Sequence, residues 1–125
     1  MIVRHDEVDV HRLPGLSHRT VAGSPQGLKQ MEVWVQTVEP GAATPVHRHD
    51  CEEAIVILEG SGVLAMDGRE QTFGAGSTLV IPRDAVHQVK STGPDPIRLV
   101  AALAAAPVRV NTADNERIPL PWDAP

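Results

Sequence analysis

The chain has 125 residues, of which 42% are hydrophobic and 22% charged, proportions typical of one soluble globular domain. Its formal net charge of −5 and the absence of a long apolar run argue against nucleic-acid binding and against a membrane role. The first ten residues lack the apolar core of a secretion signal, and the single cysteine cannot form an intrachain disulfide, so we expect one cytoplasmic domain over residues 1–125.

Short β-strands account for most of the expected structure. Ten glycines and eleven prolines separate short β-branched segments and mark turns between them. Residues 63–73 are predicted to form a hairpin, because Asp67-Gly68 tolerates the positive φ angles of a two-residue turn. The other expected strands cover residues 30–38, 53–59, 77–82, 85–91 and 97–104. Strands at this spacing predict an all-β sandwich or barrel.

The C-terminal part of the sequence has less regular patterns. Residues 101–106 have a helix-forming composition, but they continue a β-like segment and stop at Pro107, so we predict a strand. Residues 111–125 are polar and proline-rich. We expect them to form an extended tail in which Leu120 and Trp122 anchor to the outside of the sheet.

Two histidines and two glutamates fall within the seven residues 47–53. If residues 47–57 are extended, alternate side chains share one face. That face carries His47, His49, Cys51, Glu53, Ile55 and Ile57. The alternation selects Glu53 over the adjacent Glu52, and it places polar ligand groups above an apolar floor. This arrangement suits a metal ion at the open end of a barrel.

His87 is the candidate for a third imidazole. It follows a glycine turn at Gly76, an apolar strand and a proline turn at Pro82, and this hairpin could bring it beside residues 47–53. Three imidazoles and one carboxylate suit one divalent transition metal ion such as Fe, Mn, Ni, Cu or Zn, with positions left open for water or substrate.

The spacing of these residues resembles that of the cupin family. The first cupin motif, G-x5-H-x-H-x3-E-x6-G, is matched in full by Gly41, His47, His49, Glu53 and Gly60. This joint spacing is far more specific than a single His-x-His pair.

The second cupin motif, G-x5-P-x-G-x2-H-x3-N, is matched with two departures. Gly76, Pro82 and His87 fit, whereas Asp84 replaces a glycine and Ser91 replaces an asparagine. Aspartate tolerates turn conformations well, so the first departure should leave His87 in place.

The resemblance implies a small antiparallel jelly-roll barrel over about residues 30–104, with the N-terminal strands and the C-terminal tail packed on it. It also implies that His47, His49, Glu53 and His87 hold the metal, and that the chain forms a homodimer through its N-terminal strands. Small cupins of one domain include dioxygenases of small carbon compounds, cyclases and isomerases.

Four further residues are candidates to line a pocket beside the metal. They are Gln36, Cys51, Ile55 and Met66. The pattern of residues 30–38 does not decide which face is inside, the one with Trp34 and Gln36 or the one with Val33 and Val35. Among the remaining histidines, His18 is the one that could reach the rim of the site.

The residues near the motifs restrict the chemistry. The chain has no tyrosine, and few acid or base groups accompany the expected ligands, so no catalytic side chain is assigned. Arg48 and Arg83 are expected to point outward or lie in loops, which favours a small, largely uncharged organic substrate. We therefore predict a metal-dependent enzyme, with Fe(II)-type dioxygenation first and isomerisation, cyclisation or lyase chemistry second. The alternative is a module that binds a metal and a small ligand without turnover.

Overall fold

The computed structural model describes residues 1–122, and within this range the regular elements are almost all β-strands. In chain order they are η1 (His5–Glu7), β1 (His11–Leu13), β2 (Leu16–Ala22), η2 (Ser24–Gln26), β3 (Glu32–Val38), β4 (Glu53–Glu59), β5 (Gly62–Met66), β6 (Arg69–Phe73), β7 (Thr78–Ile81), β8 (His87–Ser91) and β9 (Ile97–Leu103). The predicted all-β class is confirmed. Within residues 1–122, η1 and η2 are far too short to cross a membrane.

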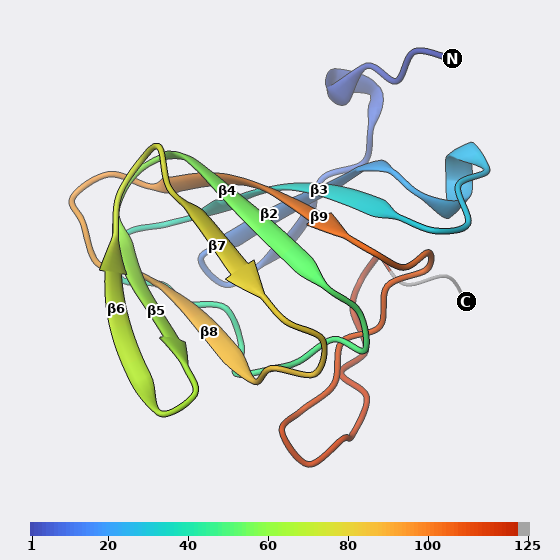
Figure 1. The fold of residues 1–125 in the computed structure, drawn as a ribbon. Helices are drawn as coiled ribbons and strands as arrows, with labels where there is room; N and C mark the ends of the chain where they lie inside the picture. The colour runs from blue at the N-terminus through green and yellow to red at the C-terminus, as the bar shows by residue number, and fades with distance from the viewer. Residues whose placement is uncertain (123–125) are drawn as a thin grey trace.

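The strands form two antiparallel sheets that face each other (Figure 1). The larger sheet has the order β1-β2-β3-β9-β4-β7, and the smaller has the order β6-β5-β8. Strand β9 lies between β3 and β4, so strands distant in the chain are neighbours in the sheet. This topology is the predicted small jelly-roll barrel. Its core lies between the sheets, where Val38, Ile57, Ile97 and Leu103 are almost fully buried.

The alternation in β3 decides which face points inward. Trp34 and Gln36 are buried between the sheets, whereas Val33 and Val35 lie on the outer side and are partly exposed. The inner face therefore supplies an indole and an amide to the interior. Both groups lie close enough to the open end of the barrel to contribute to a site there.

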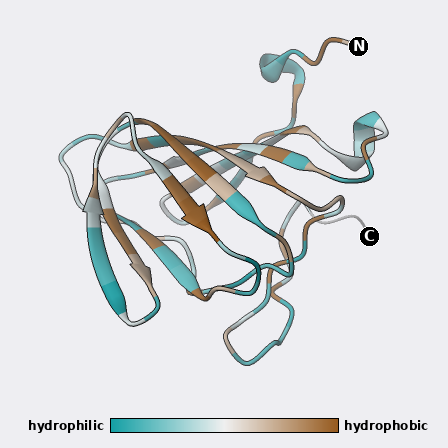
Figure 2. Cartoon of the chain, in the orientation of Figure 1, coloured by the Kyte–Doolittle hydropathy of each residue, from teal (hydrophilic) through white to brown (hydrophobic). Residues whose placement is uncertain are grey.

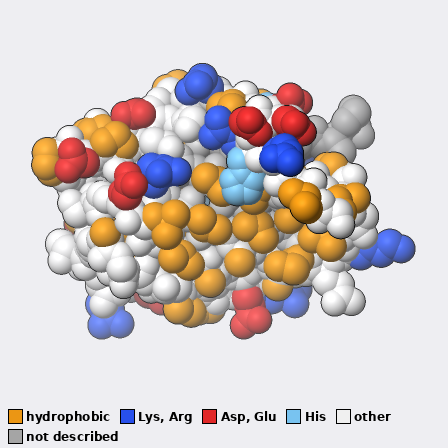
Figure 3. All heavy atoms as spheres, turned by 90° about the horizontal axis from the view of Figure 1, so that it is seen from above, with side chains coloured by type: hydrophobic (Ala, Val, Ile, Leu, Met, Phe, Trp, Pro, Cys, Tyr) orange, Lys and Arg blue, Asp and Glu red, His pale blue; other side chains and the backbone are white. Residues whose placement is uncertain are grey.

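The outer face of the larger sheet carries exposed apolar side chains on β4 and β7. Figure 2 shows hydrophobic colouring on β4 and β7 but a hydrophilic β6, and Figure 3 shows a broad hydrophobic area on the upper face of the molecule. Val56, Leu58 and Val80 expose 39%, 50% and 68% of their surface. The homodimer expected from the cupin resemblance stays a prediction.

Local sequence signals account for the turns. Met66 pairs with Arg69, which leaves Asp67 and Gly68 as the two residues of the hairpin turn, with φ angles of 55° and 71°. The strand expected over the alanine-rich segment is confirmed as far as Leu103, where β9 ends.

Residues 47–52 differ from the extended strand that the alternation suggested. Strand β4 begins only at Glu53, and His47 and Arg48 make isolated bridges to other segments. The side chains nevertheless alternate between buried and exposed from residue 47 to residue 53. The alternation persists because His47 pairs with His87 and Arg48 pairs with Asn111. These single bridges keep the segment extended, although it belongs to no regular strand.

Candidate functional site

The two predicted histidine segments meet at one end of the barrel. His47 donates its backbone N–H to the His87 carbonyl at 3.0 Å, and His87 donates its own to the His47 carbonyl at 2.9 Å. Because both residues of such a pair point their side chains to the same side, the bridge brings the two imidazoles together. Glu53 approaches from the first position of β4.

Three imidazoles form a compact, buried group. One ring nitrogen from each of His47, His49 and His87 lies within 4.8 Å of the other two. The Glu53 carboxylate completes the cluster, with Oε1 at 3.2 Å from His87 Nε2 and at 3.6 Å from His49 Nε2. The structure thus brings all four expected ligands to one place, and three of them could hold a metal ion as they stand.

Hydrogen bonds fix which nitrogen of each ring faces the centre. Each Nδ1 contacts a backbone carbonyl, which can only accept a hydrogen bond, so each Nδ1 must carry the proton. The partners are Pro45 for His47 at 2.6 Å, Arg109 for His49 at 2.9 Å and Ala85 for His87 at 2.9 Å. In the neutral ring Nε2 then carries the lone pair, and this Nδ1–H tautomer is the form of imidazole that binds a metal through Nε2.

The electrostatics of the cluster favour a cation at its centre. Burial, reinforced by the neighbouring imidazoles of His87 and His49, lowers the pKa of His47 to about 3, so this ring is neutral at pH 7. Among the described residues, His49 Nε2 and Glu53 Oε1 are buried and have no hydrogen-bond partner. Buried acceptors that face one another are costly unless a positive charge lies between them. A divalent metal ion would satisfy them together.

An apolar cavity of about 50 Å³ lies beside the imidazole cluster. Its lining combines side chains from both sheets with side chains from the C-terminal segment. They are Leu13, Leu16, Trp34, Gln36, Thr44, Pro45, His47, Glu53, Ile55, His87, Val89, Leu99, Ala101, Val110, Leu120 and Trp122. Among the described residues of this lining there is no lysine or arginine, and the only ionisable groups are those of His47, Glu53 and His87.

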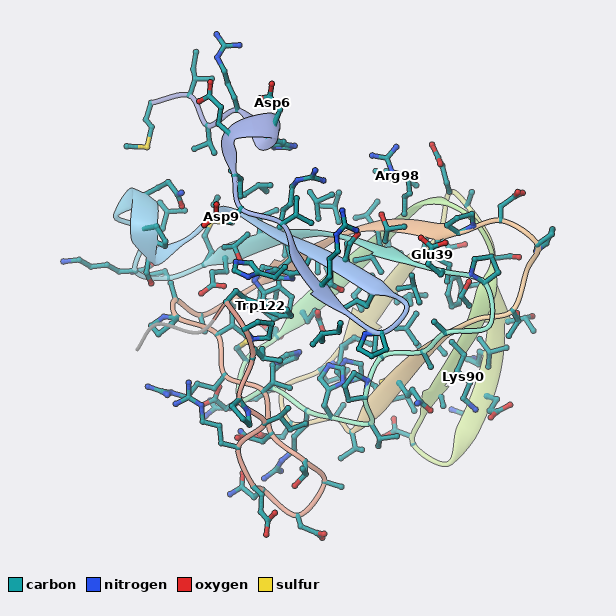
Figure 4. All side chains as sticks on the ribbon, turned by 180° about the vertical axis from the view of Figure 1, so that it is seen from behind. Asp6, Asp9, Glu39, Lys90, Arg98 and Trp122 are labelled. Atoms are coloured by element: carbon teal, nitrogen blue, oxygen red, sulfur yellow. The ribbon has the colours of Figure 1, made fainter. Side chains whose placement is uncertain are left out.

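The C-terminal segment lies elsewhere than the sequence suggested. We expected Leu120 and Trp122 on the outside of the sheet, but both line the cavity. Trp122 stacks on His18 at a ring distance of 3.5 Å and an angle of 7°, and Figure 4 labels it where this segment approaches the first strands. The prediction failed because pairing of Arg48 with Asn111 carries the segment across the open end. Residues 123–125, the end of the predicted tail, lie outside the described residues.

His18 is buried deeper than the rim position expected for it. Its Nδ1 accepts a hydrogen bond from Gln36 Nε2 at 2.9 Å, and its Nε2 lies 2.8 Å from the Thr20 hydroxyl. Burial, with a smaller contribution from His11, lowers the pKa of His18 to about 3. The neutral ring thus forms a flat support for Trp122 and holds Gln36 in the cavity wall.

The four suggested pocket residues divide into two groups. Gln36 and Ile55 line the cavity. Cys51 instead belongs to the hydrophobic core, where burial and the nearby carboxylates Asp50 and Glu53 raise the pKa of its thiol to about 11. Met66 lines a separate, more open hollow under the β5–β6 hairpin. Met66 departs because it is the last residue of β5, beside the Asp67-Gly68 turn of the hairpin.

Two features of the site escaped the motif analysis. Glu32 is a buried carboxylate on the inner face of β3, and the rings of Trp34 and His49 meet edge to face with their centroids 5.8 Å apart. The alternation of Glu32, Trp34 and Gln36 on one face was the available signal, but it did not show that this face was the inner one.

Asp84 explains how the second motif tolerates its departure from glycine. Its φ angle is +65°, in the left-handed region that a glycine would adopt readily and that aspartate adopts more easily than most residues. Its backbone N–H donates to the His49 carbonyl at 2.8 Å. The loop that carries His87 is thereby tied to the first motif.

Comparisons with known proteins agree with this fold. A family model described as auxin binding protein matches residues 7–122. Auxin-binding protein 1 of Arabidopsis thaliana is 38% identical over an alignment of 134 positions, which covers 92% of this chain and 68% of that protein. The matched region includes the N-terminal strands and the C-terminal segment, both of which lie outside the cupin motifs.

Two relatives of other descriptions are also similar. Dimethylsulfoniopropionate lyase DddW of Ruegeria pomeroyi is 33% identical over 86 residues, which cover 69% of this chain and 56% of the lyase. The structure of the polyketide cyclase RemF from Streptomyces resistomycificus superposes with a TM-score of 0.72 and 26% identity, covering 98% of this chain and 88% of the cyclase.

Proposed function

Because this chain belongs to the auxin-binding protein family within the cupin superfamily, we propose that it binds a small organic molecule at a metal ion inside the barrel. His47, His49, Glu53 and His87 would hold the metal. One observation carries this proposal: three buried imidazoles, each bonded to a backbone carbonyl through Nδ1, turn their Nε2 atoms toward one point beside an apolar cavity. The metal, a Lewis acid when bound, would attract an oxygen donor of the ligand.

The cavity lining supports a ligand that is mainly apolar and carries one metal-binding oxygen group. Trp34, Ile55 and Trp122 offer apolar and aromatic contact, and Gln36 and Thr44 offer neutral polar groups. Since the described lining contains no lysine or arginine, a ligand with several negative charges would lack compensation for desolvation. A small carboxylic acid, whose single negative charge would face the metal, matches the charge and polarity of this lining. The similarity to auxin-binding proteins supports auxin as a first candidate, for which the cavity of about 50 Å³ would have to widen.

Binding without turnover is favoured over catalysis by the inventory of ionisable groups. Within the described lining, every ionisable side chain is one of the expected metal ligands, so no separate acid or base is placed beside the ligand. The relatives named as a lyase and a cyclase support turnover as a second candidate, of the isomerisation, cyclisation or lyase type. Fe(II)-type dioxygenation has support only from the chemistry of the donor set.

Metal content tests the proposal first. The untagged protein, purified without chelators, is analysed by elemental mass spectrometry beside His47→Ala, His87→Ala and the exposed-site control His5→Ala. We expect about one transition metal ion per chain in the wild type and the control, and little in the two ligand variants. A wild type that carries no metal and takes up none on addition would overturn the proposal.

Ligand binding tests the second part. Auxin and a series of small aryl and alkyl carboxylic acids are titrated by calorimetry into the metal-loaded and the metal-free protein. We expect saturable binding that needs the metal and is lost in Gln36→Ala or Trp34→Ala more than in the exposed control Val80→Ala. Mass spectrometry of the same mixtures separates the two candidates, because a changed compound would support an enzyme and an unchanged one a binding protein.

A further inference from the structure

Glu32 is a buried carboxylate that the proposed metal site does not use directly. It lies at the start of β3 with 6% of its surface exposed. A buried carboxylate is costly unless its oxygens accept hydrogen bonds, and both Glu32 oxygens do so. Oε1 accepts from the Trp34 indole N–H at 2.7 Å, and Oε2 accepts from the Val108 backbone N–H at 2.9 Å.

Both hydrogen-bond donors lead directly to His49. The Trp34 ring meets the His49 ring edge to face, with centroids 5.8 Å apart and an interplanar angle of 74°. Val108 precedes Arg109, whose carbonyl accepts the His49 Nδ1–H at 2.9 Å. One carboxylate therefore holds two of the groups that contact His49 from outside the cluster.

The chain makes room for this carboxylate at Gly23. A Cβ atom on residue 23 would lie 2.6 Å from Glu32 Cγ and 3.3 Å from its carboxyl carbon, both closer than ordinary contact. Cγ lies in the middle of the side chain, so an alanine at this position could be accommodated only if the Glu32 side chain moved. The position of the Glu32 side chain therefore depends on a glycine at residue 23.

We propose that Glu32 is a positioning residue for His49, an inference that rests on the proposed metal site. By docking residues 108–110 and Trp34 together, Glu32 keeps the Arg109 carbonyl against His49 Nδ1. That contact holds the proton on Nδ1 and leaves Nε2 free to bind the metal. Val110 of the docked segment also lines the cavity, so Glu32 links the ligand set to the wall of the organic pocket.

A carboxylate suits this position better than an amide of the same shape. An indole N–H and a peptide N–H both need an acceptor, and only a carboxylate offers an acceptor oxygen on each side. In Glu32→Gln, the amide NH2 faces one of these donors, and one hydrogen bond is lost. The variant therefore removes the proposed role with little change in volume.

The first readout uses the metal-free protein. Nitrogen-15 NMR of the imidazole side chains reports the tautomer of each histidine in the wild type, Glu32→Gln, Gly23→Ala and the control Glu39→Gln, an exposed glutamate beyond the other end of β3. We expect His49 to change from the Nδ1–H form to a mixture in Glu32→Gln and Gly23→Ala. His47 and His87 should keep their form in every variant, because their carbonyl partners belong to their own loops.

The second readout is titration of Co²⁺ into the same proteins, followed by the visible spectrum. Loss of a hydrogen-bonding partner of a metal ligand weakens metal binding about 10- to 100-fold, so we expect this loss in Glu32→Gln and Gly23→Ala but not in Glu39→Gln. A purely structural role would lower the midpoint of denaturant unfolding while leaving the His49 tautomer and the Co²⁺ spectrum unchanged. That result would overturn the inference.

The two proposals fail in different ways. If the wild type bound no Co²⁺, the proposed function would fail, while the NMR measurement would still decide whether Glu32 sets the His49 tautomer. If Glu32→Gln did not fold, Gly23→Ala would supply the test, because it displaces the carboxylate and keeps every hydrogen-bonding group. An unchanged His49 tautomer in a folded Gly23→Ala protein, together with Co²⁺ affinity within about twofold of the wild type, would overturn the positioning role.

Discussion

His47 and His87 are oriented by their own loops, whereas His49 is oriented by a distant part of the chain. The first two donate Nδ1–H to carbonyls two residues earlier, and His49 donates to the Arg109 carbonyl 60 residues later. Two of the rings are thus positioned by local backbone geometry. The third depends on how the C-terminal segment docks, so the cupin motifs alone do not complete the site.

This difference explains why the family match extends beyond the two cupin motifs. The match covers residues 7–122, well beyond the two motifs. Residues 104–122 provide the partner of His49 and part of the cavity lining, and the first strands provide His18 and Leu16. The flanks therefore belong to the site as much as the motifs do.

The largest expected effect comes from removing an imidazole ligand, whether its ring is oriented by its own loop or by the C-terminal segment. His49→Ala and His87→Ala should each lower metal affinity by more than the roughly 100-fold upper limit for loss of a hydrogen-bonding partner, because each removes a ligand itself. Both proteins should remain folded by circular dichroism, since the core lies beneath the site. A His87→Ala protein that kept full Co²⁺ affinity would break the comparison by showing that a locally held ring is dispensable.

Acid should weaken the distant arrangement through His18, which supports Trp122. The pKa of His18 is about 3 in the folded protein and 6.5 for an unperturbed imidazole, so the unfolded chain binds the proton more readily. Its contribution to stability is complete above about pH 6.5 and is lost as pH falls toward 3, at up to about 1.4 kcal/mol per pH unit.

Denaturant unfolding of the metal-free protein between pH 7 and pH 4 measures this contribution. His18→Gln, which keeps hydrogen-bonding groups without a titrating ring, should show a shallower dependence on pH by about one proton. Equal slopes for the two proteins would mean that His18 is not the residue whose protonation loosens the region around Trp122.

A smaller effect is expected from the local arrangement at Asp84. Asp84→Val puts a β-branched residue at φ +65° and should cost about 1–2 kcal/mol of unfolding free energy, whereas Asp84→Gly should be neutral or slightly stabilising. Thermal unfolding of the two variants beside the wild type makes the measurement. Asp84→Val should also alter the NMR signals of His87 more than those of His47, which would show that this loop orients the His87 ring locally.

The smallest effect is expected at Cys51, between the two motif histidines and Glu53 in the sequence but outside the cavity. Burial raises the pKa of its thiol to about 11, so the nucleophilic thiolate is scarce at pH 8. Iodoacetamide should label the native protein far more slowly than the urea-unfolded protein, as followed by mass spectrometry. Rapid labelling of the native form would place Cys51 at the cavity after all.

The sequence predicted the features that depend on short-range patterns. His47, His49 and Glu53 share the inner face as predicted, although they do not form one strand. The reason is that buried and more exposed positions still alternate through the loop. Asp67-Gly68 determined its turn. In these cases the deciding contacts lie within a few residues or within one hairpin. His87 does reach the first motif, but not through the expected hairpin, because β7 and β8 lie in different sheets and the bridge to His47 places it.

The features that the sequence did not reveal depend on contacts between distant segments. Nothing near Leu120 or Trp122 indicates that they cross the open end of the barrel, because that path is set by pairing of residues 48 and 111. Glu32 resembles an ordinary strand residue until Val108 is placed beside it. The inner face of β3 was likewise undecided, since both of its faces carry apolar side chains.

The partner of His49 also affects when the site can form during synthesis. All four expected ligands have left the ribosome's catalytic centre before residue 109 is added, and at 5–20 residues per second the delay after His87 is about 1–4 seconds. During that interval the growing chain already contains the histidines but lacks the carbonyl that orients His49. The ligand geometry of the folded protein therefore cannot be completed until the C-terminal segment has been made and has docked.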